Sequence, residues 1–394
     1  MIHNLMSRDS LALSGSVLGI ASIWLGWLTL KPNRVATGYS YHMWEVSGWD
    51  AATTVILGLW LICFVLSLLG KGRLSAIFLG VAANLILIVT FMLVGLSATQ
   101  LLQGEEPFAR VSLGAGVWTS LLAAYILIFA ARHRLLEIPS WRHLISFTGV
   151  AVVIALLAIG WLNNLSVIQE YTGRESRFHQ ELLQHILLFV GSVTAGALLG
   201  IPLGIWATRS RRVEKPIFFF ANITQTIPSL ALFGLLIAPL SAISFAFPVL
   251  REIGIRGVGP APAVIALIIY SLLPIVRNTF VGLRQLDPAV IDAGLGMGMS
   301  RSQVFRRIEV PLASPLVLEG VRTASVQSVG LVTVAALIGA GGLGWFIFRG
   351  LGQAAPDLII LGAIPIIILA FVVDAVMRTL VRIATPKGLA GGTS

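Results

Sequence analysis

Charged residues inside long apolar runs are the first candidates for chemistry in this chain. Glu319, Arg322 and Asp374 each lie within such a run. A charge in hydrocarbon is costly and points to function by default. Glu319 and Arg322 are spaced i, i+3 and can neutralise each other on one helix face, and Asp374 has Arg378 at i+4. We favour structural ion pairs over a proton relay for all of these side chains.

Motifs for nucleotide, metal and acid–base chemistry are missing from the sequence or out of context. A phosphate-binding loop needs Lys followed by Ser or Thr, whereas every lysine here is followed by Pro or Gly. Residues 339–344 match the spacing G-x-G-x-x-G but follow an apolar run, which indicates a close-approach turn rather than a dinucleotide site. The histidines lack metal-ligand spacing. We predict no catalytic residue, no metal and no cofactor bound by this chain.

The composition determines the solvent in which these residues must be positioned. The chain has 394 residues, of which 57% are hydrophobic and 11% charged, against about 25% charged in soluble domains. So few charges cannot cover so large an apolar mass in water, which excludes a soluble enzyme and a disordered chain. The runs are continuously apolar rather than alternating, so they predict helices. The predicted fold class is an all-α integral membrane protein.

The apolar runs predict about ten transmembrane helices, since a span needs about 20 residues. The runs are 11–30, 51–69, 74–97, 114–131, 144–162, 182–207, 216–246, 260–283, 312–338 and 357–380. The run 216–246 is too long for one straight span, and we predict that Pro228, Gly234 or Pro239 kinks or breaks it. Lys and Arg favour one set of loops by about two to one, which places both termini in the cytoplasm.

A polar stretch, 164–181, divides the sequence and is predicted to be an external linker. It separates an N-terminal set of about five spans (1–163) from a C-terminal core of five (182–384). The two sets show no sequence similarity to each other, which argues against a secondary transporter built from inverted repeats.

Residues 287–310 form an unusually long connection between two predicted spans. The local signals, in order, are Asp287 (N-cap), Pro288 (first helical position), Gly298 (left-handed stop), Ser300 with Gln303 (capping box) and Pro311 (start of the next span). They predict two short helices outside the membrane. Val304, Phe305 and Ile308 share one face of the second, and Arg301, Arg306 and Arg307 occupy much of the rest. Such a segment suits docking to a cytoplasmic partner or contact with anionic headgroups, and both interpretations stay open.

The same segment resembles the EAA motif of binding-protein-dependent ABC importer permeases, E-A-A-x3-G-x9-I-x-L-P. The matching positions are Asp292, Ala293, Gly294, Gly298, Ile308 and Pro311, with Asp292, Gly294 and Val310 replacing Glu, Ala and Leu. The stretches 225–232, 270–278 and 336–344 look like the osmoprotectant permeases for glycine betaine, choline, carnitine or proline. The resemblance covers roughly 182–384, and the 1–163 extension is similar to that of YehY-like permeases.

This resemblance implies the membrane-spanning subunit of a type I ABC importer in the bacterial cytoplasmic (inner) membrane. Its implied partners are a second permease subunit, a periplasmic or tethered substrate-binding protein, and cytoplasmic ATPase subunits that bind ATP and Mg and receive residues 288–309. Arg301 and Phe305 join the motif residues in that coupling segment. Nucleic acid is not among the partners. The implied solute is a small osmoprotectant such as glycine betaine or another quaternary amine.

Three alternatives remain open at this point. A permease of this family could carry methionine or another small solute. A secondary transporter would need unpaired intramembrane carboxylates and a repeat. A membrane enzyme acting on a lipid-linked substrate would need clustered acids or a histidine in an interfacial loop.

Polar or amphipathic side chains inside the core runs are candidates for the solute pathway. They are Gln225, Thr226, Ser229, Tyr270, Asn278 and Gln327. A solute that must enter and leave requires weak contacts, which such groups supply. The alternative is that each side chain hydrogen-bonds a neighbouring helix.

Overall fold

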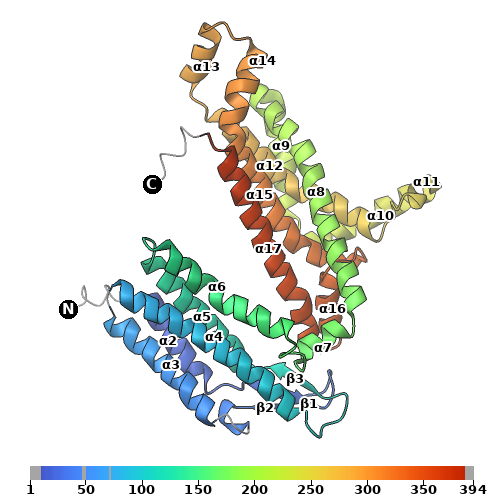
Figure 1. Cartoon of the computed structure of the whole chain (residues 1–394). Helices are drawn as coiled ribbons and strands as arrows, with labels where there is room; N and C mark the ends of the chain where they lie inside the picture. The colour runs from blue at the N-terminus through green and yellow to red at the C-terminus, as the bar shows by residue number, and fades with distance from the viewer. Residues whose placement is uncertain (1–9, 47–49, 71, 387–394) are drawn as a thin grey trace. The chain divides into compact units, whose positions relative to one another are not determined.

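The computed structural model describes residues 10–46, 50–70 and 72–386 (Figure 1). The chain forms two compact units, Met1–Gly173 and Arg174–Ser394. Within the described residues, eight helices are long and apolar enough to cross a membrane, and the apolar helix Ser10–Ser22 is shorter. The predicted all-helical membrane fold is confirmed, although the first expected span is a helix of only 13 residues.

Unit 1 is a helical bundle with a small sheet at one end. Its helices are α2 (Ser10–Ser22), α3 (Asp50–Leu69), α4 (Arg73–Leu101), α5 (Ala115–Arg134), α6 (Pro139–Ala158) and α7 (Ser166–Thr172), with a 3-10 turn η1 (Met43–Glu45). The antiparallel sheet has the order β2 (Tyr39–Tyr41), β1 (Leu28–Lys31), β3 (Arg110–Leu113).

The predicted first span, 11–30, is therefore wrong at its C-terminal end. The helix stops at Ser22, and Leu28–Lys31 pairs with two strands instead. The cause lies far away in sequence: the backbone of Gly114 approaches Trp27 closely enough for its N–H to donate to the Trp27 carbonyl at 2.7 Å. A Cβ on Gly114 would lie 2.3 Å from the carbonyl oxygen of Gly26. Hydropathy cannot register such a contact.

Unit 2 contains the remaining elements. They are α8 (Glu175–Arg209), α9 (Arg211–Thr226), α10 (Ser229–Ala246), α11 (Pro248–Glu252), α12 (Pro260–Arg284), α13 (Pro288–Gly296), α14 (Arg301–Val304), the π turn η2 (Phe305–Glu309), α15 (Val310–Ala335), η3 (Ala336–Ile338), α16 (Gly344–Gly352) and α17 (Pro356–Ala384). The segment 164–181, predicted as a linker, contains α7 and the start of α8.

The predicted break in the long run 216–246 falls at Pro228. Helix α9 ends at Thr226 and α10 begins at Ser229, whereas α10 continues through Gly234 and Pro239. Proline cannot donate a backbone hydrogen bond, and it disfavours helical backbone angles at the residue before it. Ile227 is therefore extended, and α9 ends just before it.

The core of unit 2 is built on close contact between α8 and α12. Gly196, Gly200 and Gly204 lie one helical turn apart on α8 and face Ser271, Ile275 and Thr279 of α12, respectively. A Cβ at these glycines would meet side-chain atoms at 2.7, 2.9 and 2.6 Å. Small residues permit this approach, which is how membrane helices gain packing energy in the absence of a hydrophobic drive.

Candidate functional site

The first part of the segment between α12 and α15 folds as its local sequence signals predict. Asp287 accepts a hydrogen bond from the Ala289 backbone N–H at 2.9 Å, and Pro288 is the first residue of α13. Gly298 has φ +83° after the end of this helix, a conformation that costs other residues about 1–2 kcal/mol. The predicted N-cap and left-handed stop are both observed.

The capping box of the second helix is also present. The Ser300 backbone N–H donates to Gln303 Oε1 at 2.7 Å, and the Gln303 N–H donates to Ser300 Oγ at 3.3 Å. The helix that starts here does not end, however. It runs through α14 and the π turn η2 into α15, so the predicted separate second helix is the first part of a membrane helix.

Pro311 explains the π turn at the point where a break was expected. A proline ring clashes with the carbonyl four residues earlier and offers no N–H. Widening the helix over Phe305–Glu309 gives that carbonyl room, and the chain continues as a helix. A single π turn inside an α-helix frequently marks a functional position.

Two motif residues contact each other across the segment. A Cβ on Gly294 would lie 2.7 Å from Ile308 Cδ1, so α13 packs closely on η2 at this position. The half-buried Ile308 and the buried Val304 thus fasten α13 to the start of the long helix.

The outer face of the segment is exposed and combines apolar and basic side chains. Met297 is 76% exposed, and Val290 and Leu295 are also exposed. Asp292, Ala293, Arg301, Arg306 and Arg307 are exposed as well, whereas Phe305 is half-buried. Figure 1 shows α13 and α14 projecting beyond the ends of α8, α12 and α15.

An ion pair missed by sequence reasoning ties this segment to α8. Glu309 is buried, and its carboxylate pairs with the guanidinium of Arg209, the last residue of α8. The same guanidinium lies 5.5 Å from the centre of the Phe305 ring. At the same ends of the helices, Arg284 of α12 pairs with Glu214 of α9 at 3.5 Å. The available signal was a lone acid within an arginine-rich stretch.

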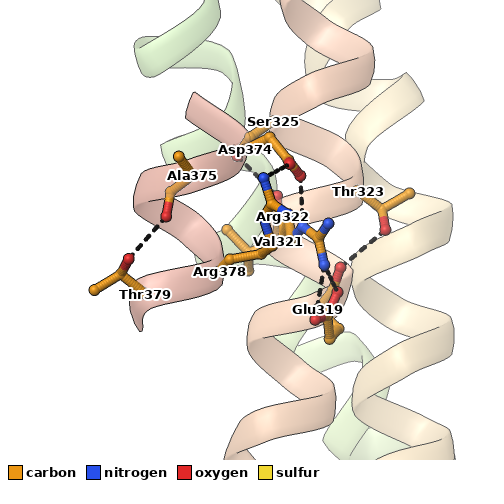
Figure 2. A network of polar contacts seen from close by, with 9 residues as sticks. All are labelled: Glu319, Val321, Arg322, Thr323, Ser325, Asp374, Ala375, Arg378 and Thr379. Carbon is orange, nitrogen blue, oxygen red and sulfur yellow. Dashed lines mark hydrogen bonds and ion pairs between the residues drawn. The ribbon is translucent and has the colours of Figure 1, made fainter. Parts of the chain in front are cut away.

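The candidate charges on α15 and α17 form one network instead of two separate pairs (Figure 2). Arg322 Nη1 donates to both carboxylate oxygens of Glu319 at 3.0 Å, and Arg322 Nε donates to Asp374 Oδ1 at 2.7 Å. Asp374 also pairs with Arg378 at 2.8 Å. Two arginines and two acids therefore balance, and Arg322 links α15 to α17.

Three of the six candidate pathway residues lie together beside the break at Pro228. Gln225 Nε2 donates to the Tyr270 carbonyl at 2.7 Å, and Gln327 Nε2 lies 3.4 Å from Gln225 Oε1. The Tyr270 hydroxyl donates to the Ile227 carbonyl, which the break leaves without a helical partner. These contacts connect α9, α12 and α15.

The other three candidates are not drawn into this cluster by hydrogen bonds. Thr226 donates to the Ile223 carbonyl at 2.7 Å, and Asn278 Nδ2 donates to the Pro274 carbonyl at 2.8 Å, both within their own helices. Ser229 is the first residue of α10 and half-buried.

The glycine-rich stretch 339–344 is a turn fixed by two residues of α8 that sequence reasoning did not connect to it. Gly339, Gly341 and Gly342 all have positive φ. The Gly342 N–H donates to Glu181 Oε2 at 2.6 Å. His185 Nε2 lies 3.0 Å from the Val329 carbonyl, which can only accept, so Nε2 carries the proton and Nδ1 accepts from the Leu343 N–H at 3.3 Å. The expected close-approach turn is present.

Comparison with known proteins places this geometry in a family. Residues 200–387 match the family described as binding-protein-dependent transport system inner membrane component. The chain is 38% identical over 208 residues to the glycine betaine/carnitine/choline transport system permease protein OpuCB of Bacillus subtilis, covering 53% of this chain and 88% of OpuCB. The chain belongs to the ABC importer permeases. Residues 7–168 of this permease match the N-terminal domain of the ABC transporter permease YehY.

The permease is also similar to other transport proteins. It is 40% identical over 206 residues to the osmoprotectant import permease protein OsmW of Salmonella typhimurium, covering 52% of this chain and 91% of OsmW. Its similarity to a solved structure of the MetNI methionine ABC transporter has a TM-score of 0.46 at 19% identity, over 54% of this chain and 98% of that one. The permease is a multi-pass membrane component and not an ATPase.

Proposed function

We propose that this permease forms the membrane pathway of an ATP-driven importer for a small osmoprotectant, a quaternary amine or zwitterion such as glycine betaine, choline or carnitine. The solute class is supported by relatives named for these solutes, which the chain matches over most of their length. A second permease subunit, identical or related, completes the pathway. The permease lies in a bacterial inner membrane, with both of its termini on the cytoplasmic side.

The observation that carries the coupling part of the proposal is the projecting segment 287–311. A docking element needs an exposed apolar surface and a firm attachment to the part that moves. Met297 and Leu295 supply the surface, while Gly294 on Ile308 and Arg209 on Glu309 supply the attachment. ATPase subunits that bind ATP and Mg would accept α13 in a surface groove.

In this scheme, the continuous helix from Arg301 to Ile338 transmits the movement. One end carries the docking segment, and the other leads into the turn 339–344 that Glu181 and His185 hold to α8. Closure of the ATPases and delivery of solute by a binding protein would then bias the same two-state element from opposite ends.

We place the solute contacts near the break at Pro228. Gln225 and Gln327 meet across two helices by a single 3.4 Å contact, which a passing solute can replace at little cost. Tyr270 is buried, and the hydrogen bond from its hydroxyl to the Ile227 carbonyl holds the backbone beside these contacts in place. The further candidates are Thr226 on α9, Asn278 on α12 and Ser229 at the start of α10.

Uptake measurements on proteoliposomes containing the permease, its ATPase and its binding protein test the solute class. We expect accumulation of radiolabelled choline, glycine betaine or carnitine and none of methionine. Gln327→Leu should raise the KM for uptake without lowering the yield of folded permease, and Thr323→Leu, an exposed position one turn away, is the matched control. Methionine uptake in place of amine uptake would contradict the proposed solute class.

A further inference from the structure

A groove in unit 1 combines mostly apolar walls with one arginine. It has a volume of about 330 Å³ and lies among α2, α5 and α6, with walls that include Leu11, Tyr125, Ile128, Phe129, Arg132 and Ser146. Its walls are mostly apolar, and Tyr125 and Phe129 are exposed at its mouth. An open apolar groove beside membrane-crossing helices suits an acyl chain.

The groove is lined by one arginine, Arg132, which is half-buried. The Nε atom of Arg132 is buried and has no hydrogen-bond partner among the described residues. A buried guanidinium nitrogen left unsatisfied costs free energy that an anionic acceptor would recover. Ser146, another polar residue on the wall beside Tyr125, donates to the Arg142 carbonyl at 2.6 Å. Among residues 10–46, 50–70 and 72–386, no acidic side chain pairs with this nitrogen.

The position of Arg132 along its helix identifies the source of that anion. It lies in the last turn of α5 beside His133 and Arg134, at a membrane-crossing helix end that the charge distribution assigns to the cytoplasm. Anionic phospholipids give the cytoplasmic leaflet its negative potential, and basic pockets between membrane helices bind their headgroups. The apolar walls run from Arg132 toward Leu11 and Phe129, as an acyl chain beneath a phosphate would require.

We propose that the groove among α2, α5 and α6 binds one anionic phospholipid, with its phosphate on Arg132 and an acyl chain along Leu11, Ile128 and Phe129. This assignment is independent of the solute and of the coupling segment, because every residue in it belongs to unit 1.

Native mass spectrometry of the full chain, titrated with phosphatidylglycerol or phosphatidylcholine, tests the site. We expect one phosphatidylglycerol retained in preference to phosphatidylcholine. Arg132→Gln should weaken that retention about fivefold, the effect of one basic residue near a lipid surface. Arg142→Gln removes the same charge near the same end of the bundle without touching the groove, so it should retain the lipid as the unchanged chain does. Equal loss in both variants, or equal binding of the two lipids, would overturn the proposal.

A second measurement needs no variant. Phosphatidylglycerol with a photoreactive acyl chain should label α5 near Phe129 in the unchanged chain more strongly than the phosphatidylcholine analogue does. Labelling at Phe129 that is equal for both lipids would contradict the role of Arg132. Competition with soluble glycerol phosphate distinguishes the sources of the anion: displacement of the lipid at equal concentration would indicate a free phosphate site and overturn the lipid assignment.

Discussion

Arg209 and Glu309 join the end of α8 to the π turn at the start of the long helix α14–α15, although 100 residues separate them in sequence. Glu309 is buried and Arg209 is half-exposed. The acid occupies the variable position between the Ile and the hydrophobic residue of the family motif. The pair therefore adds a side-chain connection from the projecting segment to α8, beside its covalent connections to α12 and α15.

Removal of one member of this pair should loosen the segment. Glu309→Gln should lower the free energy of unfolding by about 1–3 kcal/mol, because a buried charged hydrogen bond is lost. Arg209→Gln should cost a similar amount, since it leaves the buried carboxylate unpaired. The control is Arg284→Gln, whose more exposed pair with Glu214 should matter by less than about 1 kcal/mol. Chemical denaturation of the purified variants measures all three, and a larger loss for Arg284→Gln would contradict this account.

The positive φ of Gly298 should be essential for the docking segment. Gly298→Ala forces a Cβ into a left-handed conformation, and Gly298→Asp adds a charge as well. We expect both to abolish solute-stimulated ATP hydrolysis while the permease remains inserted. Gly296→Ala is the matched control, because a Cβ there meets open space at an ordinary helical φ. Normal stimulation by the Gly298 variants would show that residues 288–309 are not the docking element.

The four-residue charge network changes what single substitutions should do. Arg322→Gln leaves Glu319 without a cation, whereas Asp374 keeps Arg378. Glu319→Gln should be milder, because Arg322 still binds Asp374. The double variant should recover most of the folded yield of Arg322→Gln, since removing both partners leaves no lone charge in the span.

Yield in detergent and melting temperature, measured beside uptake in vesicles, test this ordering. A double variant that folds but does not transport would assign the pair to the solute or to a proton instead.

The distribution of basic residues predicts the orientation of the chain in the membrane. Arg211→Cys and Arg306→Cys should react with a membrane-impermeant thiol reagent from the cytoplasmic side only, and Arg174→Cys from the outside only. Cys63 is buried in α3 and supplies little background. Labelling of Arg174→Cys from the cytoplasm would contradict the predicted topology.

The features that sequence reasoning predicted are those set by residues within a few positions of one another. Asp287 caps α13 through Ala289, and Ser300 caps α14 through Gln303, so the determinants of both helix starts are local. The break at Pro228 is local for the same reason. Each depends on backbone chemistry that a short stretch of sequence fully specifies.

The contacts that sequence reasoning missed join residues far apart in the chain. Arg322 and Asp374 are 52 residues apart in sequence. Glu181 is 161 residues from Gly342, whose backbone N–H donates a hydrogen bond to its carboxylate. Hydropathy identified the helices of Arg322 and Asp374 but not which of their faces meet, and it left Glu181 in the predicted linker. The strand at Leu28–Lys31 was missed in the same way, because its partners lie in later segments.

Uptake into proteoliposomes that contain the permease with its ATPase and binding protein tests the central claim most directly. We predict that choline or glycine betaine accumulates only when ATP and Mg are available to the ATPase, and that ionophores which collapse the proton and sodium gradients leave the rate unchanged. Accumulation that proceeds without ATP and disappears with the ionophores would contradict the claim that this chain is the permease of an ATP-driven importer.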